Sequence, residues 1–260
     1  MASHPPGPCC AAGRAFEGEP TGRMIKIGRN IDAYLAEAPE SKARKGCGVL
    51  YLPDVRGIWQ NSKLMADGFA ASGYTTLIPD LFDGDSLPAD RTTETTIIDW
   101  INHGVPGKHP HIAEFVDPIV VAGVEAMRAM GIAKIAAAGY CFGAKASLQR
   151  TSTDYVVRHY KSGIDAGFIA HPSLVQEHEL QAITGPLSIA AAENDNIFPA
   201  EMRHTSEDIL VKTGQRYQIN LYGGVEHGFA VRRNVDVPVE TFARDQAFRQ
   251  AVAWFDEWLS

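Results

Sequence analysis

Residues 134–150 have the sequence KIAAAGYCFGAKASLQR: an apolar run, then Gly139-Tyr140-Cys141-Phe142-Gly143, then residues that favour a helix. The pattern Gly-x-Cys-x-Gly between a buried strand and a helix indicates a turn so sharp that small residues must flank its apex. Such a turn would place the Cys141 thiol at the carboxyl end of the strand, near the positive N-terminal end of the helix, where a thiolate is favoured. Gly and Cys also pack at ordinary buried turns, so this pattern alone does not separate a catalytic cysteine from a packing one.

Apolar runs alternate with helix-favouring stretches along the rest of the chain. This alternation is typical of a doubly wound, mostly parallel α/β sheet with helices on both faces. No linker or repeat divides the sequence, so we expect a single α/β domain over residues 1–260, with a short irregular N-terminal lead-in at about residues 1–20. Asp117 and Pro118 are expected to be the N-cap and the first residue of one helix. The expected strands are residues 24–27, 31–35, 48–52, 74–78, 134–138, 166–170, 187–192 and 217–222, and the expected helices are residues 60–72, 117–130, 144–150, 177–183, 200–212 and 241–259.

The charge and the cysteine spacing exclude several classes of protein. The chain has 260 residues with 24 Lys and Arg against 31 Asp and Glu, a net charge of −7, so we expect no nucleic-acid partner. No run reaches the roughly 18 apolar residues of a membrane span, and the N-terminus lacks the apolar core of a secretory signal, so we expect a cytoplasmic protein. Cys9, Cys10, Cys47 and Cys141 match neither a disulfide framework nor a zinc site, and we expect reduced thiols.

Two further polar residues follow apolar runs that come after Cys141 in the chain. Asp195 follows the run at 187–192, and His227 follows the run at 217–222. Nucleophile, acid and then histidine is the chain order of the α/β-hydrolase fold, which would bring Cys141, Asp195 and His227 together at one edge of the sheet. Each residue taken singly could be an ordinary loop residue, but the three in this order favour a catalytic triad. Glu193 is the competing acid, and we prefer Asp195 because it lies further into the loop.

With Pro79-Asp80-Leu81-Phe82 and His227-Gly228-Phe229 added to these motifs, the chain over residues 24–259 resembles the dienelactone hydrolase family, also called carboxymethylenebutenolidases. These are α/β-hydrolases with a Cys-His-Asp triad. The resemblance implies a hydrolase that opens a lactone or cleaves a small ester through a thioester. We expect a monomer or homodimer that needs no cofactor. The adjacent Cys9 and Cys10 resemble the lead-in of eukaryotic, particularly fungal, members.

The same resemblance suggests roles for residues after the run at 48–52. Family members carry a carboxylate there that holds the resting thiol protonated and moves when substrate binds. Asp54 matches that position, where Glu is usual, and it could instead be a simple turn residue after Pro53. The backbone N–H groups of Val55 and Phe142 would form the oxyanion hole, with two donors directed at the charge that develops on the carbonyl oxygen.

Substrate-binding residues follow less directly from the resemblance. Relatives that act on dienelactone bind its carboxylate with an arginine four residues after the catalytic histidine, and this chain has Val231 there, followed by Arg232 and Arg233. The two arginines could bind substrate or lie on the solvated surface. Trp59 and Trp100 indicate a more apolar pocket, so the substrate need not be dienelactone itself. The irregular segment at 81–112 has the length of an insertion that lines a site.

Parts of the sequence also allow two functions other than hydrolysis. A thiol-based sensor, or a small-molecule binding protein without turnover, would also use a reactive Cys141. A sensor has no need of an ordered triad, so Asp195 and His227 favour catalysis. His109-Pro110-His111 has the H-x-H form of some metal sites, but no third ligand follows at a suitable spacing, and we predict no metal site. His171 before Pro172 is expected to be structural.

Overall fold

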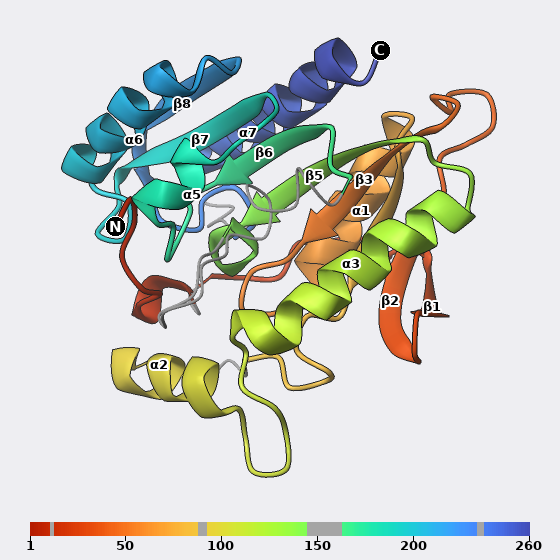
Figure 1. Ribbon diagram of the computed structural model, residues 1–260, viewed down its shortest axis with the longest axis horizontal. Coiled ribbons are helices and arrows are strands. Elements are labelled where there is room, and N and C mark those ends of the chain that lie inside the picture. The colour runs from red at the N-terminus through yellow and green to blue at the C-terminus, as the bar shows by residue number, and fades with distance from the viewer. Residues whose placement is uncertain (11–12, 88–92, 145–162, 233–236) are drawn as a thin grey trace.

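The computed structural model describes residues 1–10, 13–87, 93–144, 163–232 and 237–260, and an eight-stranded sheet lies at its centre (Figure 1). The strands are β1 (Arg23–Ile27), β2 (Ile31–Ala36), β3 (Cys47–Leu52), β4 (Thr75–Pro79), β5 (Lys134–Tyr140), β6 (Ala166–Ala170), β7 (Leu187–Asn194) and β8 (Tyr217–Glu226). The helices are α1 (Gln60–Ala71), α2 (Glu94–His103), α3 (Ala113–Ala129), α5 (Glu177–Gln181), α6 (Ala200–Thr213) and α7 (Pro238–Trp258), and two short 3-10 turns are η1 (Pro8–Cys10) and η2 (Cys141–Ala144).

The strand order is β1-β2-β4-β3-β5-β6-β7-β8. Strand β2 pairs antiparallel with both β1 and β4, whereas all neighbouring strands from β4 to β8 pair in parallel. The prediction of a mostly parallel sheet is therefore confirmed. Because parallel strands all end at the same edge, the loops after β3, β5, β7 and β8 come together there.

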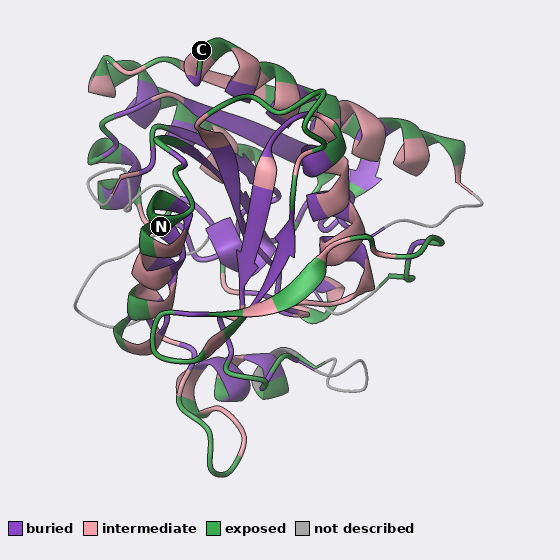
Figure 2. Cartoon of the chain, turned by 90° about the vertical axis from the view of Figure 1, so that its right-hand side faces the viewer, coloured by how far each residue is buried: buried purple, intermediate pink, exposed green. Residues whose placement is uncertain are grey.

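Residues of the central strands alternate between two hydrophobic layers, one on each face of the sheet. In β3, Val49 and Tyr51 belong to the layer that includes buried residues of α1 and α7, whereas Leu50 and Leu52 belong to the layer that includes buried residues of α3 and α6. Figure 2 shows the strands as the buried centre between these layers. Burial on both faces explains why the central strands are continuous apolar runs in the sequence.

Helix α3 begins earlier than the sequence indicated. We expected Asp117 as its N-cap and Pro118 as its first residue, but the N-cap is Ile112 and Pro118 lies inside the helix. Burial of Val116 against the sheet extends the helix toward its N-terminus, and this packing outweighs the hydrogen bond that the proline cannot donate. The C-terminal end was predicted correctly, since Gly131 follows with a φ of 83°.

The segment at 81–112 is more ordered than its composition suggested. Helix α2 covers residues 94–103, with the Thr93 side chain accepting a hydrogen bond from Thr96 N. The buried Trp100 anchors this helix, because its indole N–H donates to Asp85 O at 2.8 Å and its ring packs against Phe82. The helix expected at 144–150 falls outside the described residues, except for its first residue.

The first ten residues, the N-terminal segment, are tied to loops at the carboxyl edge of the sheet. Ala2 N and Ser3 N donate to Val175 O at 2.7 and 3.0 Å, and His4 N donates to Ile197 O at 2.7 Å. Ala2 and Ser3 are completely buried. This part of the predicted irregular lead-in is thus integrated into the fold. None of the helices within the described ranges is long and apolar enough to cross a membrane.

Candidate active site

Cys141 lies directly after β5, at the apex of a strained turn. Its φ is 50°, a left-handed conformation that is unfavourable for a residue with a side chain. A Cβ atom on Gly143 would lie 2.0 Å from Leu52 O, so only glycine fits at that position. The close packing of this turn against the end of β3 accounts for the second glycine of the Gly-x-Cys-x-Gly pattern.

Asp195 follows β7, His227 follows β8, and their side chains face each other. His227 Nδ1 lies 3.1 and 2.9 Å from the two carboxylate oxygens of Asp195. Both side chains are buried, and Asp195 also accepts hydrogen bonds from the backbone N–H groups of Ile197 and Phe198. The carboxylate therefore fixes the orientation of the imidazole and leaves Nε2 directed toward the thiols. Glu193, the competing acid, accepts a hydrogen bond from Gly224 N at 2.7 Å instead.

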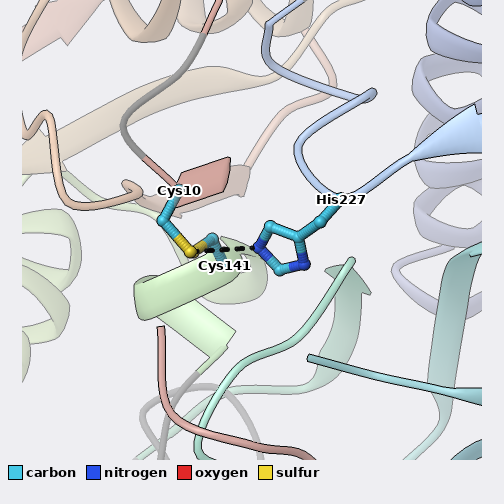
Figure 3. A group of neighbouring side chains, drawn as sticks. All are labelled: Cys10, Cys141 and His227. Carbon is cyan, nitrogen blue, oxygen red and sulfur yellow. Dashed lines mark hydrogen bonds between the residues drawn. The ribbon is translucent and has the colours of Figure 1, made fainter. Parts of the chain in front are cut away.

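A second thiol, which the sequence analysis did not place in the site, lies between Cys141 and His227. The side chain of Cys10 projects from η1, and its Sγ lies 3.2 Å from Cys141 Sγ and 3.4 Å from His227 Nε2 (Figure 3). Both cysteines are completely buried. The two sulfurs and the imidazole nitrogen all lie within 4.8 Å of one another, so Cys10 is in direct contact with both Cys141 and His227.

Two further polar residues border the thiol. Ser173 Oγ lies 3.7 Å from Cys141 Sγ. The His171 ring packs edge-on against the His227 ring, with centroids 4.9 Å apart. Burial lowers the pKa of His171 to about 4, so its imidazole is neutral at pH 7 and does not compete with His227 as the cation.

The electrostatics favour a charged pair of thiolate and imidazolium. Burial raises the pKa of Cys141, but the hydrogen bond with Cys10 and the positive charge of His227 outweigh it and lower that pKa well below its ordinary value. Burial lowers the pKa of His227, but the negative charges of Cys141 and Asp195 outweigh it and raise the pKa to about 10. Both shifts favour the form in which the imidazole carries the proton and the sulfur is the anion.

This charge distribution predicts an unusual pH dependence for thiol alkylation. The rate at which iodoacetamide modifies Cys141, followed by mass spectrometry of its peptide, should be nearly constant between pH 6 and 8. An ordinary thiol with a pKa near 8.5 becomes roughly a hundredfold more reactive over that interval because its thiolate fraction rises with pH. Free glutathione in the same samples is the control. A rise of roughly tenfold per pH unit for Cys141 itself would contradict the ion pair.

Asp54 and Arg232 form a buried ion pair beside the thiols. Arg232 Nη1 lies 2.8 Å from Asp54 Oδ2, both side chains are at most 2% exposed, and the same nitrogen donates to the backbone oxygen of Cys10. Gly228 has a φ of 91°, and a Cβ there would lie 2.5 Å from Arg232 Nη2, so glycine makes room for the guanidinium. Burial raises the pKa of Asp54, and the charge of Arg232 opposes that rise. Arg232 is thus not on the solvated surface, and Arg233 lies outside the described residues.

The remaining predicted site residues lie near the ends of neighbouring strands. Val55 follows β3 and Phe142 follows β5, and these two strands are paired up to Leu52 and Gly139. The Phe142 ring packs against Phe82, with centroids 5.0 Å apart.

The two tryptophans occupy different surroundings. Trp100 lies with its ring centroid 6.2 Å from that of Phe142, so it borders the nucleophile turn through this ring. Trp59 is the N-cap of α1, and its ring lies under the guanidinium of Arg56, at 5.5 Å.

The His-x-His motif at 109–111 is accounted for by packing. His111 Nε2 lies 3.0 Å from Asp85 Oδ2 in a buried contact, whereas the His109 ring stacks on Phe115. Within the described ranges, the group of side chains that could hold a metal ion is Cys10, Cys141 and His227, and neither residue of the motif belongs to it.

A mostly parallel sheet that carries a cysteine, an aspartate and a histidine after β5, β7 and β8, in that chain order, defines an α/β-hydrolase. The sequence model of the "Dienelactone hydrolase family" matches residues 31–259, and the chain belongs to this family. The resemblance seen in the sequence is therefore confirmed, and the chain is a hydrolase of this type.

Known proteins similar to the chain agree with this assignment. The hydrolase pyvD of Aspergillus violaceofuscus is 42% identical over 100% of this chain and 99% of its own length, and the hydrolase tropI of Talaromyces stipitatus is 43% identical over the same shares. A Klebsiella pneumoniae crystal structure assigned as a dienelactone hydrolase has a TM-score of 0.69 at 14% identity, covering 92% of this chain and 99% of that one. At this identity the structural likeness shows the fold alone.

Proposed function

We propose that the chain hydrolyses a small ester or lactone through a thioester on Cys141, with His227 as the acid and base and Asp195 as its orienting carboxylate. The observation that carries this proposal is the arrangement of the three side chains. The thiol is on a strained turn, and the imidazole that faces the two thiols is fixed through its other nitrogen by a buried carboxylate. A sensor needs a reactive thiol but gains nothing from an oriented base.

In the proposed reaction the Cys141 thiolate attacks the carbonyl carbon, and the oxyanion accepts hydrogen bonds from the backbone N–H groups of Val55 and Phe142. The imidazolium of His227 protonates the leaving oxygen as the C–O bond breaks. The neutral imidazole then removes a proton from water, which attacks the thioester and releases the acid and the thiolate. A thiolate is a weak base, so the reaction suits good leaving groups such as the enolate of an enol lactone.

We propose Trp59 and Trp100 as parts of an apolar substrate pocket. Arg232 is engaged with Asp54, which supports a neutral lactone or ester over one that carries a carboxylate. Asp54 would then restrain Arg232 more directly than it gates the thiol. A substrate carboxylate would have to compete with Asp54 for Arg232, or be bound by Arg233, for which the described residues give no geometry.

The thioester is the decisive test. The protein is mixed with p-nitrophenyl acetate, quenched in acid within milliseconds to seconds, and analysed by mass spectrometry. We expect an acetyl group on the Cys141 peptide, which disappears as turnover is completed, and a burst of p-nitrophenolate. Steady-state rates with dienelactone and with unsubstituted enol lactones then establish the preference between charged and neutral substrates. Turnover without any acyl group on Cys141 would exclude this mechanism.

The proposal includes a cytoplasmic location, a single domain over residues 1–260 and a monomer or homodimer. Cell fractionation, a single cooperative unfolding transition and light scattering test these three points in turn.

A further inference from the structure

Cys10 is the least expected member of the site. It comes from the N-terminal segment, residues 1–10, which lies outside the matched family region of residues 31–259. Its sulfur is nevertheless in contact with the sulfur of Cys141, 131 positions further along the chain. We propose that Cys10 and Cys141 form a reversible disulfide under oxidation, which switches the nucleophile off and protects it from irreversible damage. The switching of activity rests on the proposed function, but the bond itself does not.

The N-terminal segment is held so that the two sulfurs stay together. Four backbone hydrogen bonds join residues 2–4 to residues 174, 175 and 197, and Ser3 Oγ accepts a fifth from Val175 N. At the other end, the guanidinium of Arg232 holds the backbone oxygen of Cys10. These contacts give the Cys10 thiol a high effective concentration at Cys141. A disulfide needs a sulfur separation of about 2.05 Å, so the two sulfur atoms, now 3.2 Å apart, must approach by about 1 Å for the bond to form.

The charges assign the two cysteines different roles. The pKa of Cys141 is lowered, as described above, so its thiolate is the nucleophile that reacts with the oxidant. Burial and the hydrogen bonds with Cys141 and Cys9 raise the pKa of Cys10 well above its ordinary value, so this thiol keeps its proton until the second step.

The oxidant in this reaction is a hydroperoxide such as hydrogen peroxide. The Cys141 thiolate attacks one peroxide oxygen, the O–O bond breaks, and a sulfenic acid forms while hydroxide leaves and is protonated to water. The sulfur of Cys10 then attacks the sulfenic sulfur, an S–S bond forms, an S–O bond breaks, and the hydroxide that leaves takes the Cys10 proton as water. Two thiols and one peroxide thus give one disulfide and two waters, with two electrons passing from sulfur to oxygen. A dithiol reductant reverses the bond by exchange.

The same atoms could instead hold a soft metal ion. Two thiolates on one tetrahedral zinc ion, each about 2.3 Å from the metal, stand about 3.8 Å apart. The separation of 3.2 Å between Cys10 Sγ and Cys141 Sγ is shorter, which favours sulfur–sulfur chemistry over metal binding.

The test is made on reduced protein in EDTA, treated with hydrogen peroxide and then blocked with iodoacetamide. A non-reducing tryptic digest should contain the peptide of residues 1–14 linked to the peptide of residues 135–145. Because Cys9 and Cys10 lie in one peptide, the digest is repeated with Cys9→Ser, which should keep the link, and with Cys10→Ser, which should lose it. Cys47→Ser is the matched control, since this partly buried thiol contacts Leu259 O at the opposite end of β3.

Activity supplies a second readout. In wild type, peroxide should remove at least nine tenths of the hydrolysis and dithiothreitol should restore it, whereas Cys10→Ser should lose activity that the reductant does not restore, because its Cys141 proceeds to the sulfinic acid. Absence of the linked peptides in oxidised wild type overturns the proposal, and so does a link that requires Cys9. If the link forms in a protein that hydrolyses no ester or lactone, the disulfide stands and only the proposed function fails.

Discussion

Replacing Cys141 with alanine is expected to lower kcat/KM for p-nitrophenyl acetate or an enol lactone by roughly 10⁴-fold or more. The alanine removes the atom that forms the thioester, and the oxyanion donors and His227 alone can only assist the attack of water. Loss of the nucleophile or of the histidine alone costs about as much as loss of the whole triad, because these members act as a unit. Steady-state rates at several substrate concentrations measure the effect. His227→Ala should fall into the same range.

The control for this change is Cys47→Ala. Cys47 is a partly buried thiol at the start of β3, at the opposite edge of the sheet from the buried Cys141, and it contacts Leu259 O. We expect its kcat/KM to stay within about twofold of wild type. Its free energy of unfolding should change by the amount that is usual when a small side chain is truncated. Equal activity of Cys141→Ala and wild type would show that Cys141 is not the nucleophile.

The strands could be predicted from the sequence because their physical cause is local. A strand buried on both faces is a continuous apolar run, and the runs at 48–52, 134–138 and 166–170 each became a central strand. The strands expected at 24–27 and 31–35 also formed, as the hairpin of β1 and β2, and Gly28 and Asn30 provide the positive φ values of its turn. The start of α3 could not be predicted, because it depends on where Val116 packs against the sheet.

The proximity of Cys141, Asp195 and His227 could be predicted from the topology of the sheet alone. Once Cys141, Asp195 and His227 are placed after parallel strands, they must meet at one edge, as the contact between His227 and Asp195 bears out. The topology of the sheet does not determine the position of Cys10. It lies in a lead-in without periodicity, and its approach to Cys141 depends on backbone hydrogen bonds formed only in the folded chain. The adjacent cysteines were the one available signal.

Arg232 shows a similar limit. Its sequence neighbourhood allowed a substrate-binding or a surface residue, and in the structure it is a buried partner of Asp54, 178 positions away. A charge pair of this kind arises from two loops at the same edge of the sheet. The sequence of one loop does not reveal that the other loop places a side chain of opposite charge beside it.

Replacing Arg232 with methionine is expected to lower the free energy of unfolding by about 3–5 kcal/mol at pH 7, measured by urea denaturation. The change leaves Asp54 buried without its partner and removes the donor to the Cys10 oxygen. Without the guanidinium, burial raises the pKa of Asp54 further, so the folded state keeps a proton that the unfolded state releases. The free energy of unfolding of the variant should therefore fall as the pH rises above the unfolded-state pKa of about 3.9. The difference in this free energy between wild type and variant should be smallest in acid.

Two variants separate the loss of the ion pair from the loss of an arginine side chain. Adding Asp54→Asn to Arg232→Met removes the uncompensated charge, so the double variant should recover a large part of the stability and lose the pH dependence. Arg23→Met removes an exposed guanidinium that pairs with the exposed Glu37, and a surface pair of this kind contributes less than about 1 kcal/mol. An Arg232→Met protein as stable as wild type at pH 7 would mean that Asp54 is already neutral in the folded state, and the buried pair would then be a hydrogen bond between a carboxylic acid and a guanidinium.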